Sequence, residues 1–366
     1  MINPLTKQKM RINPVLTLFL ILINGSLAAQ SSQAQRWTLE KAEKWHAGHP
    51  WLSGANFIPS NAINQLEMWQ ADTFDPQTID RELGYAQEIG MNVMRVYLHS
   101  LAYKRDPKGF KQRVDQYLDI SDKRGIKTML VFFDDVWDKD PKVGRQREPK
   151  PGTHNSGWMQ DPGDPASREA ANFPFLETYV KDIMETFKDD ERVLLWDLYN
   201  EPGNSGKGNS SIPLLKAVFS WARAVNPSQP ISVGLWSWGL VDLNAIQALN
   251  SDIITYHHYS DAEDHRRLIE LLGTHGRPMI CTEYMARTRN SRFSNIMPML
   301  KEENIGAINW GLVKGKTNTI YEWDKPIPSG EEPVEWFHDI FRDDGTPYRQ
   351  DEVDLIKKLN GLPQGR

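Results

Sequence analysis

Short apolar runs alternate with amphipathic stretches along most of the chain, from residue 51 to residue 341. Each run is apolar on both faces, the pattern of parallel strands that are covered on both sides, so each predicts a buried strand. The eight runs span residues 51–59, 91–98, 126–133, 193–199, 231–235, 253–256, 279–282 and 307–312.

The stretches between the runs predict helices. Two of them begin with the same signal, Asp75 and Asp106, each followed by proline, because aspartate caps a helix and proline fits its first turn. We expect further helices near 176–187, 214–222, 242–249, 264–272, 293–303 and 333–341, and one within 36–50 that packs against the bottom of the sheet.

Eight strands, each followed by a helix, predict an α/β fold, a single (β/α)8 TIM barrel, although an open doubly wound sheet also alternates in this way. No glycine-rich dinucleotide or phosphate-loop motif follows any strand. We find no repeat or linker that would separate a second domain, and we therefore assign residues 30–366 to one catalytic domain.

Residues 1–29 have the layout of a secretory signal peptide. Lys7, Lys9 and Arg11 precede an apolar run at 15–23, and small residues follow it. The run is much shorter than the roughly 18 residues that span a bilayer, so we expect cleavage rather than an uncleaved anchor. The sequence thus predicts a secreted or periplasmic protein with no stable membrane insertion.

Composition narrows the class of partner. The 366-residue chain has a formal net charge of −5 and one cysteine, which argues against nucleic-acid binding and excludes an internal disulfide. Its 13 tryptophans indicate either an aromatic core or a surface that stacks on rings. We expect a monomer.

Two glutamates stand at strand ends, where the catalytic residues of such barrels lie. Glu201 follows the fourth predicted strand and Glu283 the seventh. One such glutamate alone would be interpreted as a structural carboxylate. Two facing each other across a barrel mouth are what glycosidic bond cleavage requires, since one protonates the leaving oxygen and the other attacks the anomeric carbon or activates water.

The sequence here resembles the glycoside hydrolases of clan A, most closely family 5, the cellulase and mannanase type. The similarity covers roughly residues 51 to 350, and the matching strand ends are Asn200-Glu201-Pro202, Glu283, Arg95, the pair His257 and Tyr259, and Trp310. The resemblance implies a retaining β-glycosidase acting on a plant- or microbe-derived oligosaccharide or polysaccharide. It implies that Glu201 is the acid/base and Glu283 the nucleophile, and that Arg95 keeps Glu283 ionised. It also implies that Trp310 lies beneath the sugar at the cleavage point.

The chemistry itself makes demands on these residues. Glu201 must be protonated, so we expect burial and the neighbouring Glu283 to raise its pKa. Glu283 must be ionised and needs a cation such as Arg95 and a donor such as Tyr259. Asn200 can donate to a sugar 2-hydroxyl.

The sequence departs from the clan at the end of the third strand, where a histidine is common and Asp134 stands instead. We interpret Asp134 either as a ligand of a sugar hydroxyl or as a salt-bridged loop residue. The long loop 134–166, with Trp137, His154 and Trp158, forms a wall of the cleft or is a solvated insertion. Trp69 and Trp236 are further candidates for stacking on sugar.

Other features predict no metal and no cofactor. His257 and His258 are adjacent on a strand and point to opposite faces, so they cannot both ligate one ion. The acidic residues after the third strand do not match an EF-hand. Arg287, Arg289 and Arg292 are interpreted as surface charges or as contacts to an acidic sugar.

Two other functions remain open from the residues alone. The first is a non-catalytic carbohydrate-binding protein on a degenerate glycosidase barrel, which need not keep both glutamates, Arg95 and Tyr259. The second is another barrel enzyme that uses an arginine and two glutamates for proton transfer.

Overall fold

Eight parallel strands form the centre of the fold in the computed structural model, which describes residues 35–166 and 168–363. The predicted signal peptide, residues 1–29, lies outside the described residues. The strands are β1 (Ser53–Asn56), β2 (Val93–Tyr97), β3 (Lys127–Asp134), β4 (Val193–Asn200), β5 (Ile231–Ser232), β6 (Ile254–His257), β7 (Met279–Glu283) and β8 (Gly306–Trp310).

The sheet closes into a barrel. Its strand order is β5-β4-β3-β2-β1-β8-β7-β6. The two outer strands meet at a parallel bridge between Leu235 and Tyr256, where Leu235 N donates to Thr255 O and His257 N donates to Leu235 O. The prediction of a TIM barrel is therefore confirmed over the open-sheet alternative.

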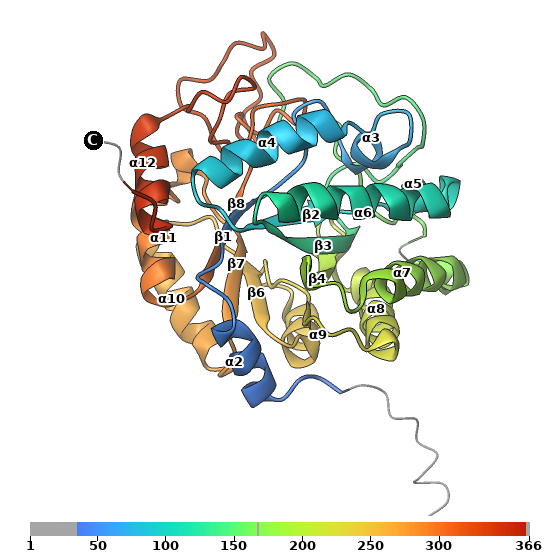
Figure 1. The fold of residues 1–366 in the computed structure, drawn as a ribbon. Helices are drawn as coiled ribbons and strands as arrows, with labels where there is room; N and C mark the ends of the chain where they lie inside the picture. The colour runs from blue at the N-terminus through green and yellow to red at the C-terminus, as the bar shows by residue number, and fades with distance from the viewer. Residues whose placement is uncertain (1–34, 167, 364–366) are drawn as a thin grey trace, which may run out of the picture. The chain divides into compact units, whose positions relative to one another are not determined.

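Helices surround the barrel, one main helix after each strand (Figure 1). The caps predicted at Asp75 and Asp106 are present, since each carboxylate accepts backbone N–H bonds in the first turn that follows it. The helices that follow β1 to β8 are α4 (Pro76–Glu88), α6 (Pro107–Lys123), α7 (Phe173–Phe187), α8 (Ile212–Val225), α9 (Val241–Asn250), α10 (Ala262–Gly273), α11 (Phe293–Glu302) and α12 (Gln350–Leu359). Shorter elements are α3 (Gln65–Trp69), α5 (Ser100–Arg105) and the 3-10 turns η1 (Ala170–Asn172), η2 (Gly208–Ser211) and η3 (Arg287–Arg289).

The helix expected at 333–341 does not form, and the last helix is α12 instead. The reason lies in Arg287, which is fully buried rather than a surface charge. Its guanidinium donates to the carbonyls of Trp336, His338 and Asp339 and to the carboxylate of Glu352 on α12. These carbonyls thus bond to a buried cation, so the apolar pattern of 333–341 reflects burial of an irregular segment.

The predicted N-terminal helix, α2 (Leu39–Ala47), covers the bottom of the barrel. Ala42 belongs to a buried apolar cluster with Leu52, Val93 and Ile280, and Trp45 packs on it. In Figure 1, α2 lies at the lower end, whereas the green loop after β3 and the orange loop after β8 rise at the upper end. The functional residues at the carboxyl ends of the strands are therefore far from α2.

Residues Arg36–Arg366 form one compact unit. Its main core joins apolar side chains of the strands to those of the surrounding helices, such as Leu130 and Val180. Within the described residues, each helix is too short or too polar to cross a membrane.

Candidate active site

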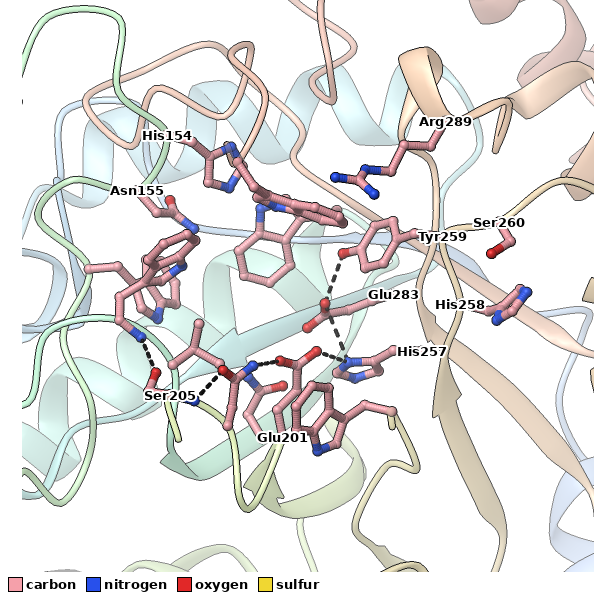
Figure 2. A pocket seen from close by; sticks show the side chains of 18 of the residues that line it. His154, Asn155, Glu201, Ser205, His257, His258, Tyr259, Ser260, Glu283 and Arg289 are labelled. Atoms are coloured by element: carbon pink, nitrogen blue, oxygen red, sulfur yellow. Dashed lines mark hydrogen bonds and ion pairs between the residues drawn. The ribbon is translucent and has the colours of Figure 1, made fainter. Parts of the chain in front are cut away.

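Glu201 and Glu283 lie together in a pocket of about 900 Å³ at the carboxyl ends of the strands (Figure 2). Glu283 is the last residue of β7, and Glu201 directly follows β4. Glu201 adopts a left-handed backbone conformation, φ 45°, which is uncommon outside glycine and is typical of functional sites. The turn is held by Asn204 N, which donates to Glu201 O at 3.0 Å.

Glu283 is surrounded by hydrogen-bond donors. Arg95 Nη1 and the Tyr97 hydroxyl donate to its Oε1 at 2.8 and 3.0 Å, and the Tyr259 hydroxyl donates to its Oε2 at 2.8 Å. Burial raises the pKa of Glu283, and the nearby Arg95, His257 and Tyr259 oppose that rise. Every one of these contacts favours the carboxylate, the form that a nucleophile needs.

Glu201 has a different environment. Asn204 Nδ2 donates to its Oε2, and its Oε1 lies 2.8 Å from His257 Nδ1. Burial raises the pKa of Glu201 to about 7, as the sequence analysis expects for an acid, but the repulsion between the two glutamates raises the pKa of Glu283 and not that of Glu201. The two carboxyl groups thus have environments suited to different tasks.

His257 lies between the two carboxyl groups. Its Nδ1 is 2.8 Å from Glu201 and 3.4 Å from Glu283 Oε2. Burial lowers the pKa of His257 to about 4, so the ring is neutral, and its Nδ1 can donate to a neighbouring carboxyl group when that group is ionised.

Arg95 organises the floor of the site. It is fully buried, and besides Glu283 it donates to Asp197 Oδ2 at 2.8 Å, Asn56 Oδ1 at 2.8 Å and Asn200 Oδ1 at 2.7 Å. Because Asn200 accepts through its oxygen, its Nδ2 faces the other way and donates to Asp134 Oδ1 at 2.9 Å. The orientation of the Asn200 amide is thereby fixed, with one N–H left for a ligand.

Tryptophan side chains form much of the pocket wall. Trp310, at the end of β8, makes edge contacts with Tyr97 and Trp158, with ring centroids 5.9 and 5.6 Å away. Trp236 donates its Nε1 to Pro202 O at 3.1 Å. The tryptophans that line the pocket are Trp137, Trp158, Trp236, Trp238, Trp310 and Trp323. The predicted candidates Trp137, Trp158, Trp236 and Trp310 are thus brought together.

Two predicted substrate ligands do not line this pocket, and both predictions are wrong. Trp69 lies on α3 with its side chain turned into the core, where it contacts Phe110 and Tyr117 and donates to Tyr97 O at 2.6 Å. Asp134 lies beneath Trp158, whose Nε1 donates to Oδ2 at 2.7 Å. Burial raises the pKa of Asp134 to about 8, although the N–H donors of Asn200 and Trp158 oppose this.

The sequence analysis missed other residues of the site, which contact the two glutamates or line the pocket. Tyr97 follows Arg95 by two positions on β2, and the period of two that places both on the inner face was the available signal. Asn204 follows Glu201 by three positions within one turn. Asn155 lies in the middle of the long loop, where no local pattern marks it.

Among the described residues, Glu201, His257 and Glu283 offer potential metal ligands within 4.8 Å of one another. Their atoms bond directly to each other, and Arg95 already neutralises Glu283. These side chains are therefore already bonded to one another and to Arg95, and we interpret them as a hydrogen-bonded acid/base cluster.

Comparisons with known proteins agree with this geometry. The profile of the cellulase family (glycosyl hydrolase family 5) matches residues 54–315. A probable mannan endo-1,4-beta-mannosidase F of Emericella nidulans is 25% identical over 130 residues, which are 35% of this chain. That match spans 28% of the relative's length.

Solved structures share the fold. An endo-beta-1,4-mannanase from Thermotoga petrophila matches with a TM-score of 0.52 at 17% identity, over 84% of this chain and 76% of its own. A GH5_18 variant from Bifidobacterium longum, in complex with Manb1-4GlcNAc, matches with a TM-score of 0.61 at 13% identity. The match covers 86% of this chain and 80% of that one. The exo-beta-1,4-mannosidase Op5Man5 from an Opitutaceae bacterium matches with a TM-score of 0.59 at 16% identity. The match covers 85% of this chain and 59% of that one.

A barrel with two carboxyl groups paired at the carboxyl ends of its strands is the arrangement of a glycoside hydrolase. The chain belongs to glycosyl hydrolase family 5, whose profile matches residues 54–315.

Proposed function

We propose that the protein cleaves its substrate by double displacement, with Glu283 as the nucleophile and Glu201 as the acid/base. The observation that carries this proposal is the closeness of the two carboxyl groups, which offer oxygens within 4.8 Å of each other. Retaining enzymes hold these groups about 5–5.5 Å apart, whereas inverting enzymes need roughly 6.5–9.5 Å to admit a water molecule.

In the first step, a Glu283 oxygen attacks the anomeric carbon as the bond to the leaving oxygen breaks. Glu201 gives its proton to that oxygen, and the result is a glycosyl ester on Glu283. Formation of the ester removes the negative charge of Glu283. In the second step, Glu201 accepts a proton from water, whose oxygen attacks the anomeric carbon and releases Glu283.

The neighbouring groups position these two glutamates. Arg95, Tyr97 and Tyr259 hold Glu283 as a carboxylate, and His257 donates to the Glu201 carboxylate once that residue has lost its proton. Asn200 presents its remaining N–H to the sugar 2-hydroxyl. Trp310 offers an apolar ring face beneath the sugar at the cleavage point.

We propose a β-mannoside of plant or microbial origin as the first substrate class to test. Support comes from the relatives, which include a probable mannan mannosidase, a mannanase and an exo-mannosidase. The aromatic lining of the pocket fits sugar rings of any β-linked hexoside, so glucosides and xylosides belong in the same screen.

The test is hydrolysis of a panel of p-nitrophenyl β-glycosides, with the first-formed anomer identified by proton NMR. We expect β-product first for the substrate that is cleaved. Glu283→Gln and Glu201→Gln should each lower turnover by at least about 100-fold. Near-normal turnover of Glu283→Gln would overturn the proposal, and sugar binding without any cleavage would favour a carbohydrate-binding protein.

We also propose that the protein is exported and acts outside the cytoplasm. The signal-like segment at 1–29 supports this proposal. Expression of the full chain in a bacterial host, with mass analysis of the periplasmic product, should show loss of about these residues, whereas an uncleaved cytoplasmic chain would contradict it.

A further inference from the structure

The long loop between β3 and α7 crosses the mouth of the barrel and is fixed on both sides. On one side it contacts the loop after β1, where Asn64 Nδ2 donates to Gly157 O at 2.8 Å. On the other it contacts the loop after β8, where Asn155 N donates to Thr317 O at 2.7 Å and Ile327 N donates to Gly152 O at 2.9 Å. The loop is therefore a fixed part of the pocket wall.

Two glycines show how closely this loop is packed. A Cβ on Gly152 would lie 1.7 Å from Ile327 O, and Gly152 has φ 59°, so glycine alone fits. A Cβ on Gly157 would lie 2.3 Å from the Ile63 side chain. The loop thus packs directly against the Ile327 backbone on one side and the Ile63 side chain on the other.

The reaction fixes which end of the pocket this wall closes. Glu201 protonates the leaving oxygen, so the leaving part of the substrate lies past Glu201, toward Ser205 and Trp238 after β4 and β5. The sugar attacked by Glu283 lies on the other side. There Trp310 contacts Tyr97, whose hydroxyl reaches Glu283.

On this side, side chains of loop 134–166 form the pocket wall. Trp158, Asn155 and His154 of the loop line the pocket there, and Figure 2 shows Asn155 and His154 together on the side away from Glu201. Behind Trp158 and Trp310 lies a second cavity of about 20 Å³. A cavity of this size holds about one water molecule and no sugar ring.

This wall also carries polar groups that suit the hydroxyls of the terminal sugar of a substrate. Asn155 Oδ1 is buried and, within the described structure, has no hydrogen-bond partner. His154 Nδ1 lies 2.8 Å from Tyr321 O, so Nδ1 is the donor and Nε2 is the acceptor of this ring. Burial lowers the pKa of His154 to about 4, which keeps the ring neutral. Two acceptors beside the terminal ring suit sugar hydroxyls, which donate.

We propose that loop 134–166 closes the glycone end of the pocket, so that the enzyme removes single sugars from the non-reducing end and Asn155 accepts a hydrogen bond from a hydroxyl of that terminal sugar. This inference rests on the proposed function, since it takes Glu201 and Glu283 in the roles given above.

The first experiment sizes the products released from a β-1,4-linked pentasaccharide whose reducing end has been converted to the alditol. The sugar is the one preferred in the glycoside panel. We expect monosaccharide and a chain shortened by one unit as the first products, and no cleavage when the non-reducing end carries a 4,6-O-benzylidene cap. Early release of disaccharide or trisaccharide, or cleavage of the capped chain, would overturn this inference and leave the proposed function unaffected. Failure to cleave any β-glycoside would overturn the proposed function and this inference with it.

The second experiment tests Asn155 directly with Asn155→Gly. Glycine keeps the left-handed backbone at this position, φ 45°, and removes the side chain. We expect kcat/KM on the terminal sugar to fall about 10- to 100-fold, the effect of leaving one substrate hydroxyl without its acceptor. The control is Arg145→Ala, an exposed position on the same loop, which should keep wild-type activity. Equal activity of Asn155→Gly and wild type would overturn the role of Asn155.

Discussion

Arg95 Nη1 lies 2.8 Å from Glu283 Oε1, and both side chains are buried, although β2 and β7 are separated in the sheet by β1 and β8. The same guanidinium also holds Asp197 and Asn200, so one cation orients the proposed nucleophile, Glu283, and the residue before the proposed acid, Glu201. A planar fork of donors can serve all of these partners at once, and a lysine ammonium cannot.

Arg95→Lys should therefore lower kcat by about 100-fold, comparable to losing one preorganised donor at a site of charge. The acid limb of the pH–rate profile should move to higher pH because Glu283 becomes easier to protonate. Steady-state kinetics across pH check both effects. An unchanged profile would show that Arg95 does not control the ionisation of Glu283.

The pH dependence of activity should follow the two glutamates. Activity should fall as pH rises through about 7, where Glu201 loses the proton that it must donate. It should fall at low pH as Glu283 becomes protonated, at a pH above the ordinary glutamate value because burial raises its pKa. A plateau that extends well above pH 8 would contradict Glu201 as the acid.

Stability should respond to Glu201 as well. Its folded-state pKa of about 7 lies above the unfolded value, so the folded protein holds the extra proton and loses stability as pH rises toward 7. Glu201→Gln cannot titrate and should be more stable than wild type above pH 7, by up to about 3 kcal/mol. Urea unfolding at pH 3, pH 5 and pH 8 measures the difference, which should shrink to about 1 kcal/mol at pH 5 and vanish at pH 3, below the unfolded-state pKa of Glu201.

Asp134 should act by positioning Asn200 and Trp158, since it contacts both and does not line the pocket. Asp134→Ala leaves two buried donors unpaired and should lower kcat/KM by about 10- to 100-fold. Asp134→Asn keeps one acceptor and should recover part of that loss. If both variants bound substrate normally and turned it over at the wild-type rate, the positioning role would be wrong.

Trp69 and Trp310 provide a matched pair of substitutions. Trp69→Phe removes the bond to Tyr97 O and leaves a cavity in the core, so it should cost about 1–3 kcal/mol of stability with little change in kcat/KM. Trp310→Phe reduces the ring face offered to the sugar and should lower kcat/KM about 10-fold. Chemical denaturation and kinetics of both variants separate the two effects, and a reversed outcome would restore Trp69 as a sugar ligand.

The barrel and the positions of its candidate catalytic side chains were predictable because both follow from strand order. Apolar runs of similar length marked the strands, and the rule that strand ends meet at one face brought Glu201, Glu283 and Arg95 together. The direction in which a loop side chain points was not predictable in this way. Trp69 follows β1 on the catalytic side, but the turn of α3 sends its ring into the core.

Long-range contacts account for the remaining errors. The segment 333–341 has a helix-like apolar pattern, yet its carbonyls bond to Arg287, a residue some fifty positions earlier in the chain. Asn155 contributes to the site only because loop 134–166 is held by the loops after β1 and β8. Such contacts join residues far apart in sequence, and local patterns do not report them.

The identity of the nucleophile is the central claim, and trapping of the covalent intermediate tests it most directly. A 2-deoxy-2-fluoro-β-glycosyl fluoride of the preferred sugar slows both steps but leaves a good leaving group, so the glycosyl-enzyme should accumulate. Peptide mass mapping after this treatment should place one fluoroglycosyl group on Glu283. A label on Glu201 or on any other residue would contradict the account, as would complete turnover of the reagent with no labelled peptide.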